Sequence, residues 1–198
     1  RIGIAAIPIP NAFAFGRSLK DGRVCVTEGI LNLLNREELK AVLGHEISHL
    51  KNKDVLTITI LSVIPMILYL LARHLMFAGY YGGRRRERGD YTALIGLAAF
   101  LGYLITNLLV LYASRIREYF ADRGSVALGN QPSWLASALY KLVYGSARIP
   151  KEALKEVEGL KAFFASDPSR AMNELRELRG LDLDRSGTID NAELESLR

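Results

Sequence analysis

Two histidines and a glutamate in the segment 45–49, His-Glu-Ile-Ser-His, have the types and spacing of a metal-dependent hydrolytic site. On a helix, positions i and i+4 share a face, so His45 and His49 can bind one ion. Glu46 lies about 100° further round the helix, where a general base can take a proton from zinc-bound water. An amphipathic helix with two surface histidines is the alternative. It is disfavoured because the motif falls inside a helix that caps and periodicity predict independently.

A third metal ligand is expected outside this segment, because a catalytic zinc usually has three protein ligands and one open position. The remaining histidine, His74, lies at the edge of an apolar block and is a poor candidate. We therefore expect a carboxylate from a later helix, and Glu118 is the candidate. Asp122, one helical turn beyond it, can accept the second N–H of a ligating histidine. Both carboxylates have an alternative role, which is ion pairing with Arg115 and Arg117 on a solvated helix face.

The metal-binding helix is predicted from its caps and its apolar stripe. Asn35, with Glu38 three residues on, forms a capping-box signature. One core-facing stripe follows at helical spacing, formed by Leu39, Val42, Leu43, Ile47 and Leu50. The polar run 51–54 is expected to end this helix.

The predicted fold class is mainly α with a small β-sheet near the N-terminus (α+β). Residues 1–27 are expected to be extended, with a short β-prone run at 24–27 after the Asp21-Gly22 turn. Thr27 is the expected N-cap of the first helix. Further helices are predicted over 28–34, 114–128, 132–147 and 169–181.

Two apolar blocks, 55–72 and 91–113, contain no charged residue. Each can cross a hydrocarbon core, which takes about 20 helical residues, so they predict a transmembrane hairpin. The alternative is a buried helical hairpin in a soluble protein. Lys and Arg are slightly more numerous in the flanks 36–54 and 114–123 than in the loop region 73–88. This weakly favours a cytoplasmic position for the predicted metal site.

The basic charge of the chain does not predict a nucleic-acid partner. The formal net charge is +5, and much of it comes from one arginine cluster at 84–88. There are no repeats of interleaved aromatic and basic residues that would stack on and neutralise a nucleic acid. The single cysteine, Cys25, excludes an intramolecular disulfide and a cysteine-based zinc site, and its apolar neighbours predict a packed structural thiol.

The C-terminal segment 182–193 fits a 12-residue calcium loop. Glycine stands at position 6, and the expected oxygen ligands come from Asp182, Asp184, Ser186, Thr188 (through its backbone carbonyl), Asp190 and Glu193. The helix that should follow is short, and such loops usually work in pairs. A solvated acidic helix cap is therefore the alternative, and modulation of the chain's activity by calcium is a hypothesis.

From about residue 8 to 145 the motifs resemble the HtpX branch of the gluzincin metallopeptidases, a family that also contains the CAAX-prenyl endopeptidases. Residues 26–31 resemble the family's pre-catalytic segment and 114–122 its third-ligand motif. The family's substrate-side strand is resembled by Asn11, Ala12, Phe13 and Ala14. One departure concerns Asp167-Pro168, where a histidine is expected before the proline.

The resemblance implies a gluzincin-type protease core with an inserted transmembrane hairpin, zinc as cofactor, and a multi-pass protein of the cell membrane. Its catalytic domain would face the cytoplasm and would cleave misfolded or damaged membrane proteins. It also implies further transmembrane helices before Arg1. We expect four segments, with the two parts of the core at 1–54 and 114–165, the hairpin at 55–113 and the calcium loop within 166–198.

Two rival functions share parts of this pattern. One is a calcium-responsive membrane adaptor with a non-catalytic metal site, although such a site does not require Glu46. The other is a prenyl-protein processing protease, which has the same chemistry but prefers a lipidated peptide. The expected partners of the favoured function are unfolded or membrane protein substrates and the lipid bilayer.

Overall fold

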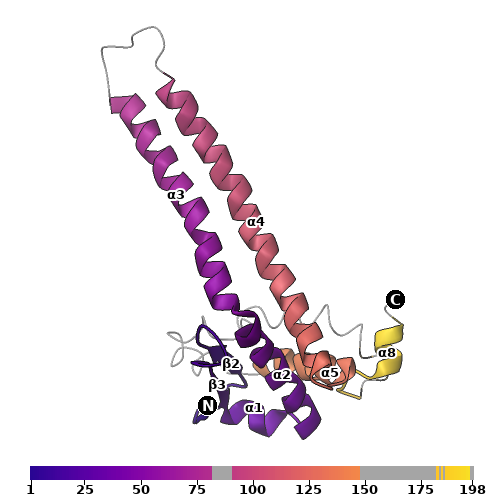
Figure 1. The fold of residues 1–198 in the computed structure, drawn as a ribbon. Helices are drawn as coiled ribbons and strands as arrows, with labels where there is room; N and C mark the ends of the chain where they lie inside the picture. The colour runs from indigo at the N-terminus through magenta and orange to yellow at the C-terminus, as the bar shows by residue number, and fades with distance from the viewer. Residues whose placement is uncertain (82–90, 148–181, 183, 185, 197–198) are drawn as a thin grey trace. The chain divides into compact units, whose positions relative to one another are not determined.

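A computed structural model describes the chain except for residues 82–90, 148–181, 183, 185 and 197–198. Its described part is mainly helical with one small sheet near the N-terminus, which confirms the predicted class of secondary structure (Figure 1). The helices are α1 (Glu28–Leu33), α2 (Arg36–Asn52), α3 (Asp54–Tyr81), α4 (Thr92–Ala127), α5 (Pro132–Ala147) and α8 (Asn191–Glu195). Contacts divide the chain into two compact units, Arg1–Lys53 with Tyr119–Arg198 and Asp54–Glu118.

The sheet has three strands, β1 (Ile2–Ala5), β2 (Ala12–Phe15) and β3 (Arg23–Thr27), in the order β1-β3-β2. β1 runs parallel to β3, whereas β2 runs antiparallel to it with Ala12 opposite Val26. The expected extended region is therefore confirmed. β2 lies at an edge of the sheet, which leaves one side of its backbone for other partners.

Side-chain caps begin the helices that follow the sheet, as predicted. The Thr27 hydroxyl accepts a hydrogen bond from the Ile30 N–H at 3.3 Å. At the start of α2 the Glu38 N–H donates to Asn35 Oδ1 at 2.8 Å, and the Asn35 N–H donates to Glu38 Oε2 at 2.9 Å. This reciprocal pair satisfies two backbone donors that a helix start leaves without helical partners. Lys53, in the left-handed region with φ of 56°, ends the helix.

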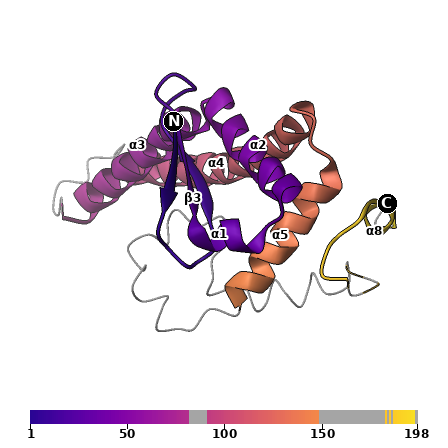
Figure 2. The same ribbon diagram turned by 90° about the horizontal axis from the view of Figure 1, so that it is seen from below.

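In the unit formed by Arg1–Lys53 and Tyr119–Arg198, α5 packs against α1 and α2. The core of this unit lies between these helices and the sheet (Figure 2). The core contains mostly aliphatic side chains, namely Ala12, Val26, Ile30, Leu34, Ala41, Val42, Leu135, Ala138 and Leu142. Of the predicted stripe on α2, Val42 belongs to the core. Leu39 and Leu43 are partly buried and pack against it. Leu50 is buried as well, whereas Ile47 is 36% exposed, so the prediction was wrong for Ile47. Burial of the other members of the stripe fixes the rotation of α2 about its axis.

Glu38 joins α2 to α5 through a buried ion pair. Its side chain is only 3% exposed, and Lys141 Nζ lies 2.8 Å from its Oε1. The Ser137 hydroxyl donates to the same oxygen at 2.6 Å. Burial raises the pKa of the Glu38 carboxyl, but hydrogen bonds from Lys141, Ser137 and the Asn35 backbone outweigh that effect and leave the pKa below its ordinary value.

Glu38→Gln is expected to lower the free energy of unfolding at pH 7 by about 3 kcal/mol, because it leaves Lys141 without its buried counter-charge. A carboxyl with a depressed pKa stabilises the fold above its ordinary pKa, and this contribution is lost as pH falls through the folded-state value. The difference between wild type and variant should therefore shrink below about pH 4.5. Denaturant titrations in detergent at several pH values measure this difference in the free energy of unfolding.

The matched control is Glu37→Gln on the exposed face of the same helix turn, where a change within about 0.5 kcal/mol is expected. Equal destabilisation by both substitutions, or a difference that does not depend on pH, would contradict this role of Glu38.

In the unit Asp54–Glu118, α3 and α4 pack side by side. The rings of Tyr69 and Tyr103 have centroids 5.4 Å apart, and a Cβ on Gly96 would lie 3.2 Å from Leu75 Cβ. Within α3 and α4, the stretches Asp54–Ala78 and Thr92–Ala127 are long and apolar enough to cross a membrane, and most of their residues are exposed. In the described part of the chain they therefore do not form the buried core that the soluble alternative requires.

Two predicted boundaries need correction. The helix expected over 114–128 is not a separate element, because α4 continues from Thr92 to Ala127. The sequence changes there from apolar to charged without a proline or a glycine, and a change in polarity alone does not end a helix. α3 likewise extends to Tyr81, beyond the apolar block 55–72. The predicted helix 169–181 and the departure at Asp167-Pro168 lie outside the described residues.

Candidate metal centre

α2 directs both histidines of the motif to one point. The Nε2 atoms of His45 and His49 lie 3.0 Å apart, and the two rings meet edge to face with centroids 4.7 Å apart. Two nitrogen ligands at about 2.0–2.1 Å from a tetrahedral zinc would be about 3.3 Å apart, so the observed distance is close to that of a metal pair. Two imidazole lone pairs that face each other require a shared proton or a cation between them.

Asp122 on α4 holds the first of these imidazoles. Its Oδ1 lies 2.8 Å from His45 Nδ1. If Nδ1 donates this hydrogen bond, Nε2 is left with its lone pair toward His49, and the carboxylate fixes the tautomer and the orientation of the ring. This is the geometry that a metal-binding histidine needs. The contact joins the residues for which the sequence predicts it, and the role of Asp122 in orienting a metal ligand stays a prediction.

Glu118 lies one helical turn before Asp122 on α4. His45, His49 and Glu118 each offer one ligand atom, and these atoms lie within 4.8 Å of one another. The division between the two compact units falls directly after Glu118, inside the continuous helix α4. Glu118 also forms a long ion pair with Arg117, the alternative role that the sequence left open. Arg117 Nη2 lies 3.8 Å from Glu118 Oε1. Arg117 Nη1 donates to the Asp54 carbonyl at 3.1 Å.

Small residues bring α2 and the C-terminal turns of α4 together. A Cβ on Gly124 would clash with the side chain of Ser48, so only glycine fits opposite this serine. The Ser125 hydroxyl donates to the Ala41 carbonyl at 2.7 Å, which ties the same two segments together. The sequence did not lead us to expect this contact. Its signal was the spacing of small residues in both segments, Ala41, Gly44 and Ser48 on α2 and Ala121, Gly124 and Ser125 on α4.

Glu46 contacts the edge strand. Its Oε2 accepts a hydrogen bond from the Ala14 N–H at 2.9 Å. Ala12, Phe13 and Ala14 belong to β2, while the preceding Asn11 is buried and its N–H donates to Thr27 Oγ1 at 2.8 Å. The predicted substrate-side segment and the predicted general base therefore meet in space.

The donor set fits zinc. Two imidazole nitrogens and one carboxylate form a three-ligand set that leaves a fourth position for water or substrate, and a further carboxylate stands beside it. These are the components of a zinc metallopeptidase site.

The sequence profile described as peptidase family M48 matches residues 1–180. The chain belongs to this family. No solved structure gives a significant match to the chain.

Individual relatives agree with this assignment. The chain is 55% identical over 142 residues to a protease HtpX homolog of Methanothermobacter thermautotrophicus. The aligned residues cover 72% of this chain and 52% of the relative. It is 43% identical over 164 residues to protease HtpX homolog 2 of Methanosarcina acetivorans, covering 83% and 56% of the two proteins. A protease HtpX homolog of Moorella thermoacetica is 38% identical over 180 residues, which cover 90% of this chain and 60% of the relative. The chain therefore spans little more than half the length of these relatives.

The C-terminal loop forms a second group of possible metal ligands. One ligand atom from each of Asp182, Asp184 and Glu193 lies within 4.8 Å of the others. Ser186 Oγ lies 2.9 Å from Thr188 Oγ1 within the same loop. Asp190 is the N-cap of α8, with its Oδ1 accepting from the Glu193 N–H at 2.8 Å.

Proposed function

We propose that this chain carries the catalytic centre of a zinc endopeptidase, with His45, His49 and Glu118 as the metal ligands and Glu46 as the general base. The observation that carries the proposal is the convergence of the two Nε2 atoms, 3.0 Å apart, beside a glutamate that contacts an edge strand. Membership of peptidase family M48 supports the same chemistry.

Each residue of the proposed site then has a defined task. When bound, zinc supplies a Lewis acid that polarises a carbonyl and lowers the pKa of water. Glu46 takes the proton of the attacking water and returns it to the leaving nitrogen. Asp122 holds the His45 ring through its Nδ1 atom at 2.8 Å, so that Nε2 stays available as a ligand.

The edge strand supports an extended substrate. A peptide that adds to the edge of β2 away from β3 is bound through its backbone, which gives affinity with little dependence on side chains. Asn11, Ala12, Phe13 and Ala14 form the proposed substrate-binding segment. Unfolded and damaged proteins offer extended chain of this kind, whereas a folded protein does not, so we propose them as the substrate class.

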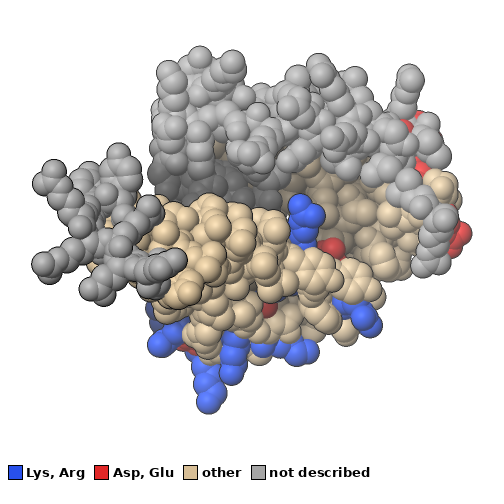
Figure 3. Space-filling model, turned by 90° about the horizontal axis from the view of Figure 1, so that it is seen from above, with Lys and Arg blue, Asp and Glu red and all other residues tan. Residues whose placement is uncertain are grey.

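The apolar helices support a membrane protein. Large apolar side chains are exposed along both of them, including Ile60, Ile67, Leu97 and Leu108. The face in Figure 3 shows mostly uncharged surface over the described residues, with basic side chains gathered mainly along one margin. We propose a multi-pass protein of the cell membrane with its active site toward the cytoplasm, the side that the distribution of Lys and Arg weakly favours.

The proposal is tested by digestion of casein, an unfolded protein, by the chain in detergent. Cleavage is expected with zinc, loss of cleavage with 1,10-phenanthroline, and recovery when zinc is added back, because the metal supplies the Lewis acid. A folded protein of similar size should resist under the same conditions. Cleavage that survives chelation at a zinc content below about 0.1 per chain would contradict the proposed chemistry.

A second arm separates the rival functions. A prenylated peptide and its unmodified form are offered in parallel with casein. Preference for the lipidated peptide would identify the prenyl-protein processing enzyme. Tight zinc binding with no cleavage of any of these substrates would support the non-catalytic adaptor.

A further inference from the structure

We propose that the loop 182–193 binds one calcium ion at a site formed by Asp182, Asp184 and Glu193. These three carboxylates come from a single stretch of 12 residues, and one oxygen of each lies within 4.8 Å of the others. The loop lies in the same compact unit as α5 and is distinct from the histidine site on α2. The zinc chemistry proposed above does not use any of these side chains.

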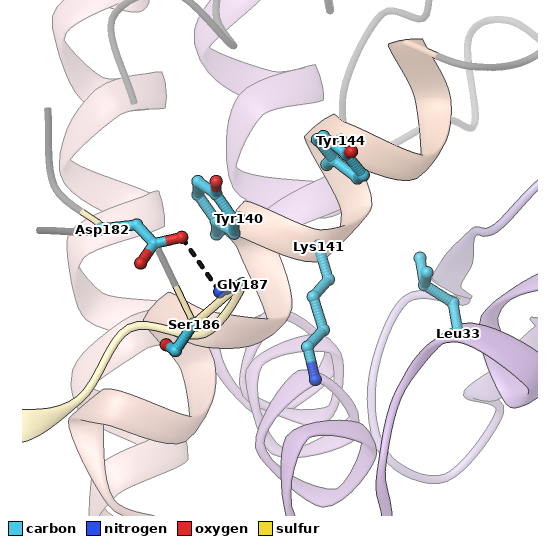
Figure 4. Close-up of a pocket in the computed structure, with 7 residues that line it drawn as sticks. All are labelled: Leu33, Tyr140, Lys141, Tyr144, Asp182, Ser186 and Gly187. Carbon is cyan, nitrogen blue, oxygen red and sulfur yellow. Dashed lines mark hydrogen bonds between the residues drawn. The ribbon is translucent and has the colours of Figure 1, made fainter. Parts of the chain in front are cut away.

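An unsatisfied buried oxygen points to a ligand at this position. Asp182 is only 7% exposed, and its Oδ1 has no hydrogen-bond partner among the described residues. Its other oxygen accepts the Gly187 N–H at 3.0 Å (Figure 4). A buried carboxylate oxygen without a partner is costly, and a cation bound by the neighbouring carboxylates removes that cost. The alternative of an acidic helix cap does not account for Asp182, because Asp190 is the residue that caps α8.

The backbone of the loop holds these oxygens in place. Gly187 has φ of +79°, which side-chain-bearing residues rarely adopt, and it stands at the turn position that calcium loops reserve for glycine. Glu193 is also buried, and its Oε2 accepts the Asp190 N–H at 3.1 Å. The last ligand position is therefore fixed by the capping box of α8 before any ion binds.

The donor atoms favour calcium over transition metals. The predicted ligands are all oxygens, and there is no histidine or cysteine within 182–193. Hard oxygen donors suit calcium, which accepts six to eight of them at about 2.3–2.6 Å in flexible geometry. A single loop without a paired partner should bind at the weaker end of the range, with Kd of about 10⁻⁵–10⁻³ M.

The surroundings of the loop supply a spectroscopic probe. Asp182, Ser186 and Gly187 line a cavity of about 630 Å³ together with Tyr140, Lys141 and Tyr144 of α5 (Figure 4). A terbium ion that replaces calcium in the loop would lie near two tyrosine rings, whose excitation can sensitise terbium emission. Binding can thus be followed without any measurement of proteolysis.

The test uses the whole chain in detergent with zinc bound and Glu46→Gln introduced to prevent self-cleavage. Calorimetric titration with calcium is expected to give one site per chain, and tyrosine-sensitised terbium emission should be displaced by calcium. Asp182→Asn is expected to weaken calcium binding by about tenfold or more, since it removes a charged ligand. Glu195→Gln is the matched control, because this exposed residue of α8 lies outside the ligand group, and its affinity should equal that of the parent.

Two results would overturn the proposal. The first is no calcium heat and no terbium emission up to about 10 mM ion, which is beyond the range of calcium-loop affinities. The second is an equal loss of affinity in the Asp182→Asn and Glu195→Gln chains. Because neither readout depends on peptide cleavage, failure of this site and failure of the proposed protease are distinguishable. The hypothesis that calcium modulates proteolysis has its own test, because casein cleavage by the active chain should then change with the same calcium midpoint.

Discussion

Glu46→Gln is expected to lower kcat for peptide hydrolysis by about 10²–10⁴-fold, the contribution of a well-positioned general base. Glutamine has nearly the same shape and can still accept the Ala14 N–H, which donates to Glu46 at 2.9 Å in the wild type. It cannot take a proton from water at neutral pH. The substitution therefore removes the proton transfer while it preserves the contact with β2, and kcat should fall far more than KM rises.

Zinc content separates this role from a role in metal binding. Glu46 is absent from the group of ligand atoms formed by His45, His49 and Glu118, so Glu46→Gln should retain as much zinc per chain as the wild type. Glu37→Gln, an exposed position on the same helix, is the matched control and should keep full activity. A Glu46→Gln chain that loses zinc, or that keeps more than about a tenth of wild-type kcat, would contradict the assignment.

Local patterns predicted the helix of the proposed metal site well. Asn35 and Glu38 form the capping box that the sequence indicates, and the i, i+4 spacing of the histidines places both imidazoles on one face of the helix, with their Nε2 atoms 3.0 Å apart. Such features depend on residues within a few turns of each other. The helix therefore has the same caps and faces whatever packs against it.

Long-range contacts were harder to predict. The Glu38–Lys141 ion pair joins residues 103 positions apart, and the fit of Gly124 over Ser48 depends on how two helices cross. No local periodicity encodes these distances. The hydrogen bond from Ala14 to Glu46 likewise requires the register of β2 on β3, which the alternation of residues in a short strand does not specify.

The close contact between α2 and the end of α4 explains why small residues matter for the metal centre. Gly124 and Ser125 lie within one turn of Asp122, and Gly44 and Ser48 flank His45 on α2. Larger side chains at these positions would separate the two helices and lengthen the 2.8 Å contact between Asp122 and His45. The sequence thus places the proposed ligands and the residues that permit their approach in the same helical turns.

Glu118→Ala is expected to weaken zinc binding by about a hundredfold or more. Protein sites bind zinc with about 10–16 kcal/mol through four ligands, or about 3 kcal/mol for each, which corresponds to a factor of about 10². His45 and His49 alone form an incomplete ligand set. Competition with a chelator of known zinc affinity measures the change, and Glu37→Ala is the exposed control.

Asp122→Asn is the comparison that separates the loss of a metal ligand from the loss of a residue that orients one. Asp122 contacts His45 Nδ1 rather than the metal position, so its substitution should weaken zinc binding by about 10–100-fold, typical of a residue that orients a ligand. Excess zinc should restore the occupancy of the Asp122→Asn chain, together with much of its activity. The Glu118→Ala chain should stay nearly inactive even when loaded, because its metal lacks a ligand. If Glu118→Ala binds zinc as tightly as the wild type, the 3.8 Å pair with Arg117 describes the role of Glu118 and another residue must be the third ligand.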